Sequence, residues 1–373
     1  MKVGIVGAGQ LGRMMALAGY PLGLDFLFLD KDAATPGGQL APILAGQLTD
    51  RRLLGELSER CDVVTFDWEN VPVGALEGLP GAARISPPTR ALAAAQDRLA
   101  EKRTFELLGI PTTHYAAVDS RESLDAAVRL VGLPGVLKTR RLGYDGKGQF
   151  VLRKPRDLDA AWAALADPKE GKAALLYENL VPFDAEVSII AVRGVQGDVA
   201  FYPLNLNVHR EGILRLTRAP YGNAALTRQA QRAAKKLLEH FKYVGVLTIE
   251  FFVKRGKLVA NEMAPRVHNS GHWTIEGAVT SQFENHVRAI AGLPLGSTAA
   301  RGHSAMINLI GELPSRDPLL AEPGLHWHDY GKSPRPGRKL GHVTICEPTA
   351  QKRDRHGFKV LARIDRATWL ALR

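Results

Sequence analysis

The sequence has little cysteine and no long apolar segment. Its 373 residues include only Cys61 and Cys346 as cysteines, and their wide separation excludes a disulfide framework and a cysteine-based zinc site. No apolar run approaches the roughly 20 residues that a membrane-spanning helix needs, so we expect no membrane partner. The first residues also lack the basic segment, apolar core and cleavage site of a signal peptide. We therefore expect a cytoplasmic protein.

Acidic residues are scarce near the C-terminus, where positive charge collects. The chain carries a net charge of +11, and residues 331–373 hold eleven Lys and Arg against three acids. Such a segment attracts anions, either nucleic acid or small phosphates. It lacks a recognition motif and the interleaved aromatic residues that stack on bases. We therefore favour small phosphates and expect no nucleic-acid partner.

What is present is typical of a globular α/β protein of two or three domains. Residues 2–6 read as a buried strand, residues 7–12 (GAGQLG) as a turn, and a helical pattern follows. This G-x-G-x-x-G arrangement, with Asp30 ending the next strand, predicts a Rossmann-like unit in which a phosphate approaches the helix N-terminus. An NAD-dependent oxidoreductase is therefore one candidate function, although similar turns bind other anions or nothing.

Two further stretches of the first 110 residues carry polar groups. Residues 67–70 (DWEN) follow a strand at 63–66, and the carboxyl ends of strands are where open α/β sheets bind ligands. A helix predicted over residues 90–108 contains Asp97, Arg98 and Lys102. We interpret these charges as solvated, while Arg98, near a domain junction, could reach a phosphate.

A second glycine-rich segment begins at Lys138, at the end of a predicted buried strand. An ammonium is costly to bury unless it meets an anion, and the following residues 143–149 (GYDGKGQ) could donate backbone N–H groups to phosphates. The segment is not a Walker A loop, because Gln149 stands where a lysine should follow Gly148. The pattern favours a nucleotide-covering loop of another type over a mobile hairpin tip.

The chain is organised around residues 245–273. Two apolar runs, 246–253 and 258–260, flank a polar turn that contains Gly256, which predicts a β-hairpin. A turn with an odd number of residues places Glu250 opposite Glu262, whereas an even turn places it opposite Asn261. Facing carboxylates beside an asparagine suit Mg²⁺. The alternative is a solvated hairpin with two unrelated glutamates.

Together with Glu186, these features and the segments 264–273 (APRVHNSGHW) and 335–342 (RPGRKLGH) resemble the ATP-grasp enzymes. The resemblance is specifically to the N5-carboxyaminoimidazole ribonucleotide synthetases and extends from residue 7 to His342. It implies an α/β fold, α+β overall, with a Rossmann-like preATP-grasp domain at 1–95. An ATP-grasp domain at 96–295, with a lid lobe at about 112–180, and a small β-rich C-terminal domain at 296–373 would follow. It also implies a homodimer.

The same resemblance implies an ATP-dependent carbon–nitrogen ligase of purine synthesis. With bicarbonate as co-substrate, and through carboxyphosphate, it would carboxylate 5-aminoimidazole ribonucleotide to N5-carboxyaminoimidazole ribonucleotide. ADP and phosphate would be released, with ATP and Mg²⁺ as cofactors. Another ATP-grasp ligase is a further alternative to this function, beside the NAD-dependent oxidoreductase.

Individual roles also follow from the resemblance. The ATP phosphates would contact Arg98, Lys138, Gly143, Tyr144, Asp145, Gly146, Lys147, Gly148 and Gln149. The adenosine end would contact Glu178, Asn179, Leu180, Val181, Glu186 and His209, and Mg²⁺ would bind Glu250 and Glu262, with Asn261 beside them. The ribonucleotide would lie near Gln10, Leu11, Glu69, Arg266, His268, Asn269 and Ser270, with Lys332, Arg338 and Lys339 at its 5′-phosphate. The candidate catalytic residues are Tyr144, Asp145, Lys147 and His268, of which Asp145 and His268 are candidates for the general base.

Overall fold

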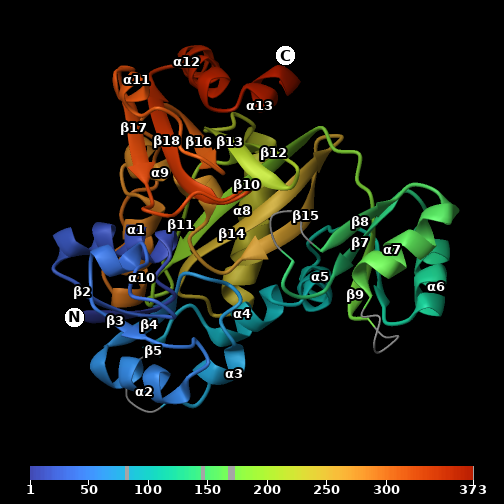
Figure 1. The fold of residues 1–373 in the computed structure, drawn as a ribbon, viewed down its shortest axis with the longest axis horizontal. Helices are drawn as coiled ribbons and strands as arrows, with labels where there is room; N and C mark the ends of the chain where they lie inside the picture. The colour runs from blue at the N-terminus through green and yellow to red at the C-terminus, as the bar shows by residue number, and fades with distance from the viewer. Residues whose placement is uncertain (80–83, 144–147, 167–172, 373) are drawn as a thin grey trace.

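The structure, a computed structural model, describes residues 1–79, 84–143, 148–166 and 173–372 (Figure 1). Four residues predicted to contact ATP or to act in catalysis lie outside the described residues: Tyr144, Asp145, Gly146 and Lys147. Three β-sheets organise the described part of the chain. None of its helices is long and apolar enough to cross a membrane.

The N-terminal sheet is parallel, with the strand order β3-β2-β1-β4-β5. Helices α1 and α2 cover its opposite faces, because alternate strand residues enter two separate cores. This is the predicted Rossmann-like layering. The elements are β1 (Lys2–Val6), α1 (Gln10–Gly19), β2 (Asp25–Asp30), β3 (Ile43–Ala45), α2 (Arg51–Arg60), β4 (Val63–Phe66), α3 (Val73–Leu76) and β5 (Arg84–Ile85), with 3₁₀ turns η1 (Tyr20–Leu22) and η2 (Gly37–Gln39).

A four-stranded antiparallel sheet of order β6-β9-β7-β8 forms a lobe that projects to the right in Figure 1. Two helices pack on it around a small core of its own. Helices α4 (Thr89–Ala95) and α5 (Arg98–Leu107) precede the lobe. Its elements are β6 (Tyr115–Val118), α6 (Arg121–Val131), β7 (Gly135–Thr139), β8 (Gln149–Leu152), η3 (Pro155–Asp157), α7 (Leu158–Leu165) and β9 (Leu175–Asn179).

The largest sheet has nine strands in the order β15-β14-β10-β12-β13-β16-β18-β17, and β11 pairs with β10. Helix α8 packs on one face, and α10 and α1 lie toward the other. The strands are β10 (Ala185–Arg193), β11 (Val199–Phe201), β12 (Asn205–Arg210), β13 (Ile213–Ala219), β14 (Gly245–Lys254), β15 (Lys257–Ala264), β16 (His303–Ile310), β17 (Leu325–Asp329) and β18 (Lys339–Glu347). The helices are α8 (Ala224–His240), η4 (Asn269–Gly271), α9 (Thr274–Gly277), α10 (Gln282–Ala291), α11 (Asp317–Leu320), α12 (Ala350–Ile364) and α13 (Arg366–Ala371).

The C-terminal strands extend this sheet, because β16 pairs with β13 of the central region and with β18. Helix α12 covers them around a further core. The predicted boundary at 295/296 thus falls between strands of one continuous sheet. The domain limits remain predictions.

The hairpin of β14 and β15 pairs Glu250 with Glu262, the pairing expected for an odd turn, but its turn has an even number of residues. Arg255 and Gly256 alone form the turn, with φ of 49° and 71°, as a type I′ turn requires. This even turn would place Glu250 opposite Asn261. A β-bulge beside Glu250 leaves Asn261 as the extra residue and restores the pairing of the two glutamates.

Candidate active site

The facing glutamates of the hairpin differ in proton affinity. Burial raises the pKa of Glu250, against the opposing effect of His209. Burial also acts to raise the pKa of Glu262, but Arg98 and Lys138 outweigh it and lower that pKa. Two carboxylates held together in this way gain from a cation that compensates both charges.

The donor set suits Mg²⁺ in a nucleotide complex. Within the described residues, no group of three or more His, Cys, Asp or Glu is arranged to hold a metal ion. Mg²⁺ needs fewer protein ligands when a nucleotide is present, because it keeps several waters and binds phosphate oxygens beside one or two carboxylates. Glu250 and Glu262 match that requirement.

Lys138 lies against a buried carboxylate. Its Nζ is 3.1 Å from Oε1 of Glu178, and Nζ of Lys102 is 3.2 Å from Oε2. Thr113 donates to the same Oε2 at 2.6 Å. Burial acts to raise the pKa of Glu178, but the two lysines hold it well below its usual value. The Glu178 carboxylate therefore faces the lysines, and its contact with adenosine stays a prediction.

The interpretation of the charges on helix α5 as solvated is wrong. Lys102 is 1% exposed, and Asp97 is also buried. Asp97 caps the helix by accepting from the backbone of Leu99, and its carboxylate binds Arg140 through two hydrogen bonds of 3.0 and 2.6 Å. The amphipathic pattern alone gave no sign of these partners, because a charged residue is normally expected on the exposed face of a helix.

Arg98 connects the hairpin to the glycine-rich segment. Its Nη1 lies 3.2 Å from Oε2 of Glu262, and its Nη2 lies 3.5 Å from the carbonyl oxygen of Gly143. Gly148, at the other end of that segment, has a φ of +68°, and a Cβ there would lie 2.5 Å from Oγ1 of Thr139. The backbone there therefore requires glycine. Gln149 begins β8 and pairs with Lys138.

The segment between the lobe and the large sheet carries the residues predicted for adenosine. The side chain of Asn179 accepts from His114 at 2.8 Å, and the backbone of Leu180 donates to Pro134 at 2.9 Å. Val181 is buried. Leu180 and Val181 thus link β9 to β10, at the junction of the two parts.

Glu186 and His209 form an ion pair beside the glutamates. Nδ1 of His209 lies 2.9 Å from Oε2 of Glu186. Burial acts to lower the pKa of His209, but Glu186 and Glu250 raise it to about 9. His209 is therefore protonated at neutral pH. Sequence analysis missed the neighbouring aromatic pair of Phe183 and Phe252. Their rings stack with centroids 4.9 Å apart, and the Phe183 side chain is 46% exposed.

His268 adjoins Glu250 on a buried polar network. Its Nε2 lies 3.4 Å from Oε1 of Glu250, and its Nδ1 lies 2.9 Å from Oγ of Ser270. Oγ of Ser270 lies 2.8 Å from Oγ of Ser188. Burial lowers the pKa of His268 well below its usual value, so its imidazole is neutral. The buried amide of Asn269 has no hydrogen-bond partner among the described residues, which suits a ligand contact.

Two pairs tie the N-terminal domain to this region. Arg266 lies 2.5 Å from Oε2 of Glu69. Nζ of Lys332 donates to Oε1 of Gln10, and burial and the nearby Arg338 lower the pKa of Lys332 to about 8. Arg338 also donates to the hydroxyl of Ser333, Lys339 begins β18, and Leu11 packs in the core. Cations therefore gather beside Gln10, as an anion site requires.

The N-terminal glycine turn is occupied by carboxylates of the chain itself. Oδ2 of Asp67 accepts from the backbone of Gly9 at 2.6 Å and of Gly12 at 3.3 Å, and Oδ2 of Asp30 accepts from Ala8 at 2.6 Å. A Cβ on Gly7 would lie 1.9 Å from Oδ1 of Asp67. The glycines thus admit a carboxylate where a dinucleotide would place its pyrophosphate. This arrangement argues against the oxidoreductase alternative.

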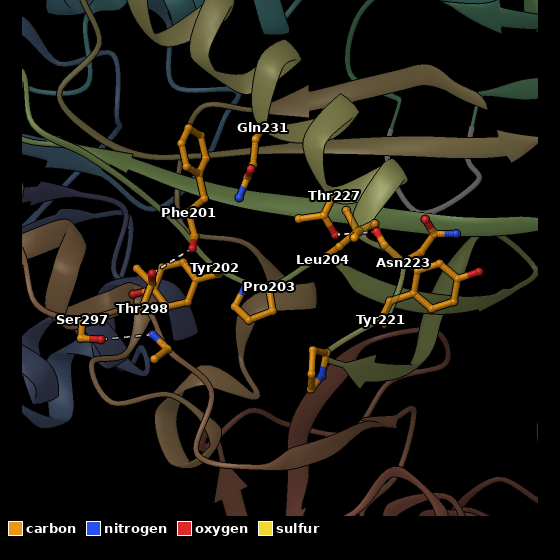
Figure 2. Close-up of a pocket in the computed structure, with 14 residues that line it drawn as sticks. Phe201, Tyr202, Pro203, Leu204, Tyr221, Asn223, Thr227, Gln231, Ser297 and Thr298 are labelled. Carbon is orange, nitrogen blue, oxygen red and sulfur yellow. Dashed lines mark hydrogen bonds between the residues drawn. The ribbon is translucent and has the colours of Figure 1, made fainter. Parts of the chain in front are cut away.

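A depression of about 620 Å³ lies elsewhere, at the start of α8 (Figure 2). Aromatic and proline side chains such as Tyr202, Pro203 and Tyr221 line it, with Thr227 and Gln231 of the helix. Its lining has no charged side chain and includes none of the predicted site residues. It therefore does not suit nucleotide phosphates.

Comparisons with known proteins cover nearly the whole chain. Family models match in three segments: a ribonucleotide synthetase preATP-grasp domain at residues 1–96, an ATP-grasp domain at 103–283, and a phosphoribosylaminoimidazole carboxylase C-terminal domain at 304–356. The N5-carboxyaminoimidazole ribonucleotide synthase of Pseudomonas aeruginosa is 49% identical over 345 residues, which are 92% of this chain and 94% of that protein.

Solved structures agree with this similarity. The N5-carboxyaminoimidazole ribonucleotide synthetase of Thermus thermophilus is 50% identical with a TM-score of 0.91, covering 97% of this chain and 98% of that one. An Aspergillus clavatus N5-carboxyaminoimidazole synthase in complex with ADP and 5-aminoimidazole ribonucleotide is 31% identical with a TM-score of 0.90, covering 98% of each chain. This chain therefore belongs to the N5-carboxyaminoimidazole ribonucleotide synthase family of ATP-grasp enzymes.

Proposed function

We propose that this chain is an ATP-dependent carbon–nitrogen ligase of purine synthesis. It carboxylates 5-aminoimidazole ribonucleotide with bicarbonate to N5-carboxyaminoimidazole ribonucleotide and releases ADP and phosphate. The observation that carries the proposal is the pairing of Glu250 with Glu262 between Arg98 and His268. The related Aspergillus clavatus structure with ADP and the ribonucleotide supports the same activity.

ATP would bind between the projecting lobe and the large sheet. Its phosphates would meet Arg98, Lys138 and the backbone at Gly143 and Gly148. Its adenosine would meet the segment from Glu178 to Val181, with Glu186 and His209 toward the ribose. Phosphoryl transfer asks a protein mainly for position and charge neutralisation, and the two cationic side chains supply both.

Glu250 and Glu262 would hold Mg²⁺, with Asn261 beside them. Bound there, Mg²⁺ would neutralise charge that develops on the phosphate oxygens. The lowered pKa of Glu262, caused by Arg98 and Lys138 against burial, keeps it ionised for that role.

The chemistry divides into two steps. An oxygen of bicarbonate attacks the γ-phosphorus, the bond from that phosphorus to the bridging oxygen breaks, and ADP leaves. The carboxyphosphate formed then loses phosphate as its carboxyl carbon bonds to the amine nitrogen of the ribonucleotide, which gives up one proton. His268, held neutral by burial, is one candidate to accept it.

The ribonucleotide would lie between the N-terminal domain and the segment at 266–270. Gln10 and Leu11 lie at the start of α1, Glu69 and Arg266 bridge the two parts, and Asn269 offers an unpaired amide. Its 5′-phosphate would meet Lys332, Arg338 and Lys339. Ser270 would act by holding His268. We further propose that the protein is cytoplasmic and forms a homodimer. Light scattering of the purified protein would test the dimer.

ADP production in the four combinations of bicarbonate and ribonucleotide tests the function. We expect substantial ADP only when both are present. ADP formation that does not depend on the ribonucleotide, or that requires an amino acid or formate, would instead indicate another ATP-grasp ligase. A substrate-dependent change in nicotinamide absorbance would reinstate the oxidoreductase.

A further inference from the structure

Helix α5 contacts three successive residues of strand β15: Asn261, Glu262 and Met263. Before Glu262, Nζ of Lys102 donates to the backbone carbonyl of Asn261 at 2.8 Å. After it, the backbone N–H of Met263 donates to Oε1 of Glu101 at 2.6 Å. The Glu262 carboxylate itself meets Arg98 one turn earlier on the helix. One face of the helix therefore fixes three successive residues of the strand.

The contact at Asn261 matters because this residue is the extra one in the β-bulge. A bulge leaves its extra residue without a partner in the strand ladder. The two-residue turn alone would pair Asn261 with Glu250, so the bulge decides which side chain faces Glu250. Lys102 donates to the backbone carbonyl of this unpaired residue.

Burial shows that these contacts are not incidental surface pairs. Lys102 is 1% exposed and Glu101 is 2% exposed. Buried charged groups are costly unless they are paired and hydrogen-bonded. Lys102 also shares the carboxylate of Glu178 with Lys138. The bulged strand and the lysine predicted to bind phosphate are therefore joined through two buried side chains, Lys102 and Glu178.

We infer that Glu101 and Lys102 are positioning residues, which hold the bulge at Asn261 and so keep Glu262 opposite Glu250 for the metal–nucleotide complex. The inference rests on the proposed function for the identity of that complex. The contacts that it invokes belong to the chain alone. Neither residue needs to touch a substrate.

Direct binding of Mn²⁺ and ADP, followed by the electron paramagnetic resonance of Mn²⁺, tests the role of Lys102. We expect Lys102→Met to weaken Mn²⁺ binding in the presence of ADP by about tenfold or more, the usual cost of losing an outer-shell partner. Lys236→Met is the matched control, because Lys236 also donates to a backbone carbonyl, that of Leu108 at 2.7 Å, but at the far end of α5. Lys236→Met should bind Mn²⁺ in the presence of ADP as tightly as the unmodified protein does.

Amide hydrogen exchange of the metal-free protein gives a second readout. Exchange at residues 261–263 should rise in Lys102→Met and stay unchanged in Lys236→Met. Unchanged Mn²⁺ binding and unchanged exchange in a folded Lys102→Met protein would overturn the inference.

Two variants of Glu101 decide the matter if Lys102→Met does not fold. Glu101→Gln keeps the shape of the native side chain and an acceptor oxygen for the backbone N–H of Met263, whereas Glu101→Leu has no acceptor. We expect Glu101→Gln to bind Mn²⁺ with ADP within about threefold of the native protein, and Glu101→Leu to bind about tenfold more weakly. Equal binding by both variants would overturn the inference. Loss of ribonucleotide-dependent turnover in the unmodified protein would instead refute only the proposed function.

Discussion

The two carboxylate sites of this molecule use the same chemical group in opposite ways. At the N-terminal turn, Asp67 accepts from backbone N–H groups and fills an anion site from within. In the hairpin, Glu250 and Glu262 face each other and gain from an added cation. The N-terminal turn resembles a nucleotide-binding motif, but its backbone N–H groups already donate to Asp67. The hairpin has only two glutamates as its sequence signal, and it suits a metal-bound nucleotide.

The largest effect should come from the hairpin site. Glu262→Gln removes a charge from the pair proposed to hold Mg²⁺ while keeping the shape of the side chain, so ADP production should fall on the order of a hundredfold. Turnover with ribonucleotide and bicarbonate measures the loss, and the unfolding midpoint checks the fold. Glu284→Gln, which breaks an ion pair with Arg288 on α10, serves as the control. Near-normal turnover in Glu262→Gln would remove the metal assignment.

The next effect concerns the acid in the N-terminal turn. Burial raises the pKa of Asp67 from 3.8 to about 6, so the folded protein binds this proton more tightly than the unfolded chain. The native protein should therefore lose stability relative to Asp67→Asn as pH rises from about 4 to 6, by roughly 2 kcal/mol.

Urea unfolding of both proteins at several pH values measures that difference. A constant difference between the native protein and Asp67→Asn across this range would mean that the Asp67 carboxyl does not titrate as a buried group. The comparison between an internally filled turn and an open metal pair would then fail.

A smaller effect is expected at the basic segment beside Gln10. Lys332→Ala combined with Arg338→Ala should raise the KM for the ribonucleotide about tenfold and leave the KM for ATP within about twofold, because these cations are proposed to hold the 5′-phosphate of the ribonucleotide. Steady-state kinetics with each substrate varied makes the measurement. Lys352→Ala, on α12, is the control, because it removes a positive charge outside the proposed site. Equal effects on both substrates would contradict the phosphate assignment.

The smallest effect is expected at Asp50, an ordinary helix N-cap that serves as a comparison for Asp67. Asp50 accepts from the backbone of Arg52 and Leu53 at the start of α2, as Asp67 does for Gly9, but it lies nearer the surface. Asp50→Ala should cost about 1 kcal/mol in the free energy of unfolding and leave turnover unchanged. Thermal unfolding and ADP production test this. A change in KM for either substrate would show that the cap is coupled to the site.

The sequence predicted the fold class and the pairing of Glu250 with Glu262, because glycine turns, strand ends and motif spacing are local signals. It did not predict how that pairing arises, because the turn is even and a bulge at Asn261 brings Glu250 opposite Glu262. Bulges leave little trace in hydrophobic alternation.

Residues that depend on distant partners were also beyond the reach of sequence patterns. Lys102 looks like a surface charge on a helix, but it is buried by Glu178 and by the carbonyl of Asn261, which is 159 positions away. Asp67 was noted only as part of a polar strand end, because its partners in the glycine turn lie more than 50 positions earlier. Neither contact follows from periodicity.

The contact between Lys332 and Gln10 joins positions 322 residues apart in the chain. During synthesis, the N-terminal domain and the hairpin emerge from the ribosome long before Lys332 does. A nascent chain thus carries Glu250 and Glu262 before it carries the cations proposed to hold the ribonucleotide. The order of translation would then delay ribonucleotide capture until almost the entire polypeptide has been made.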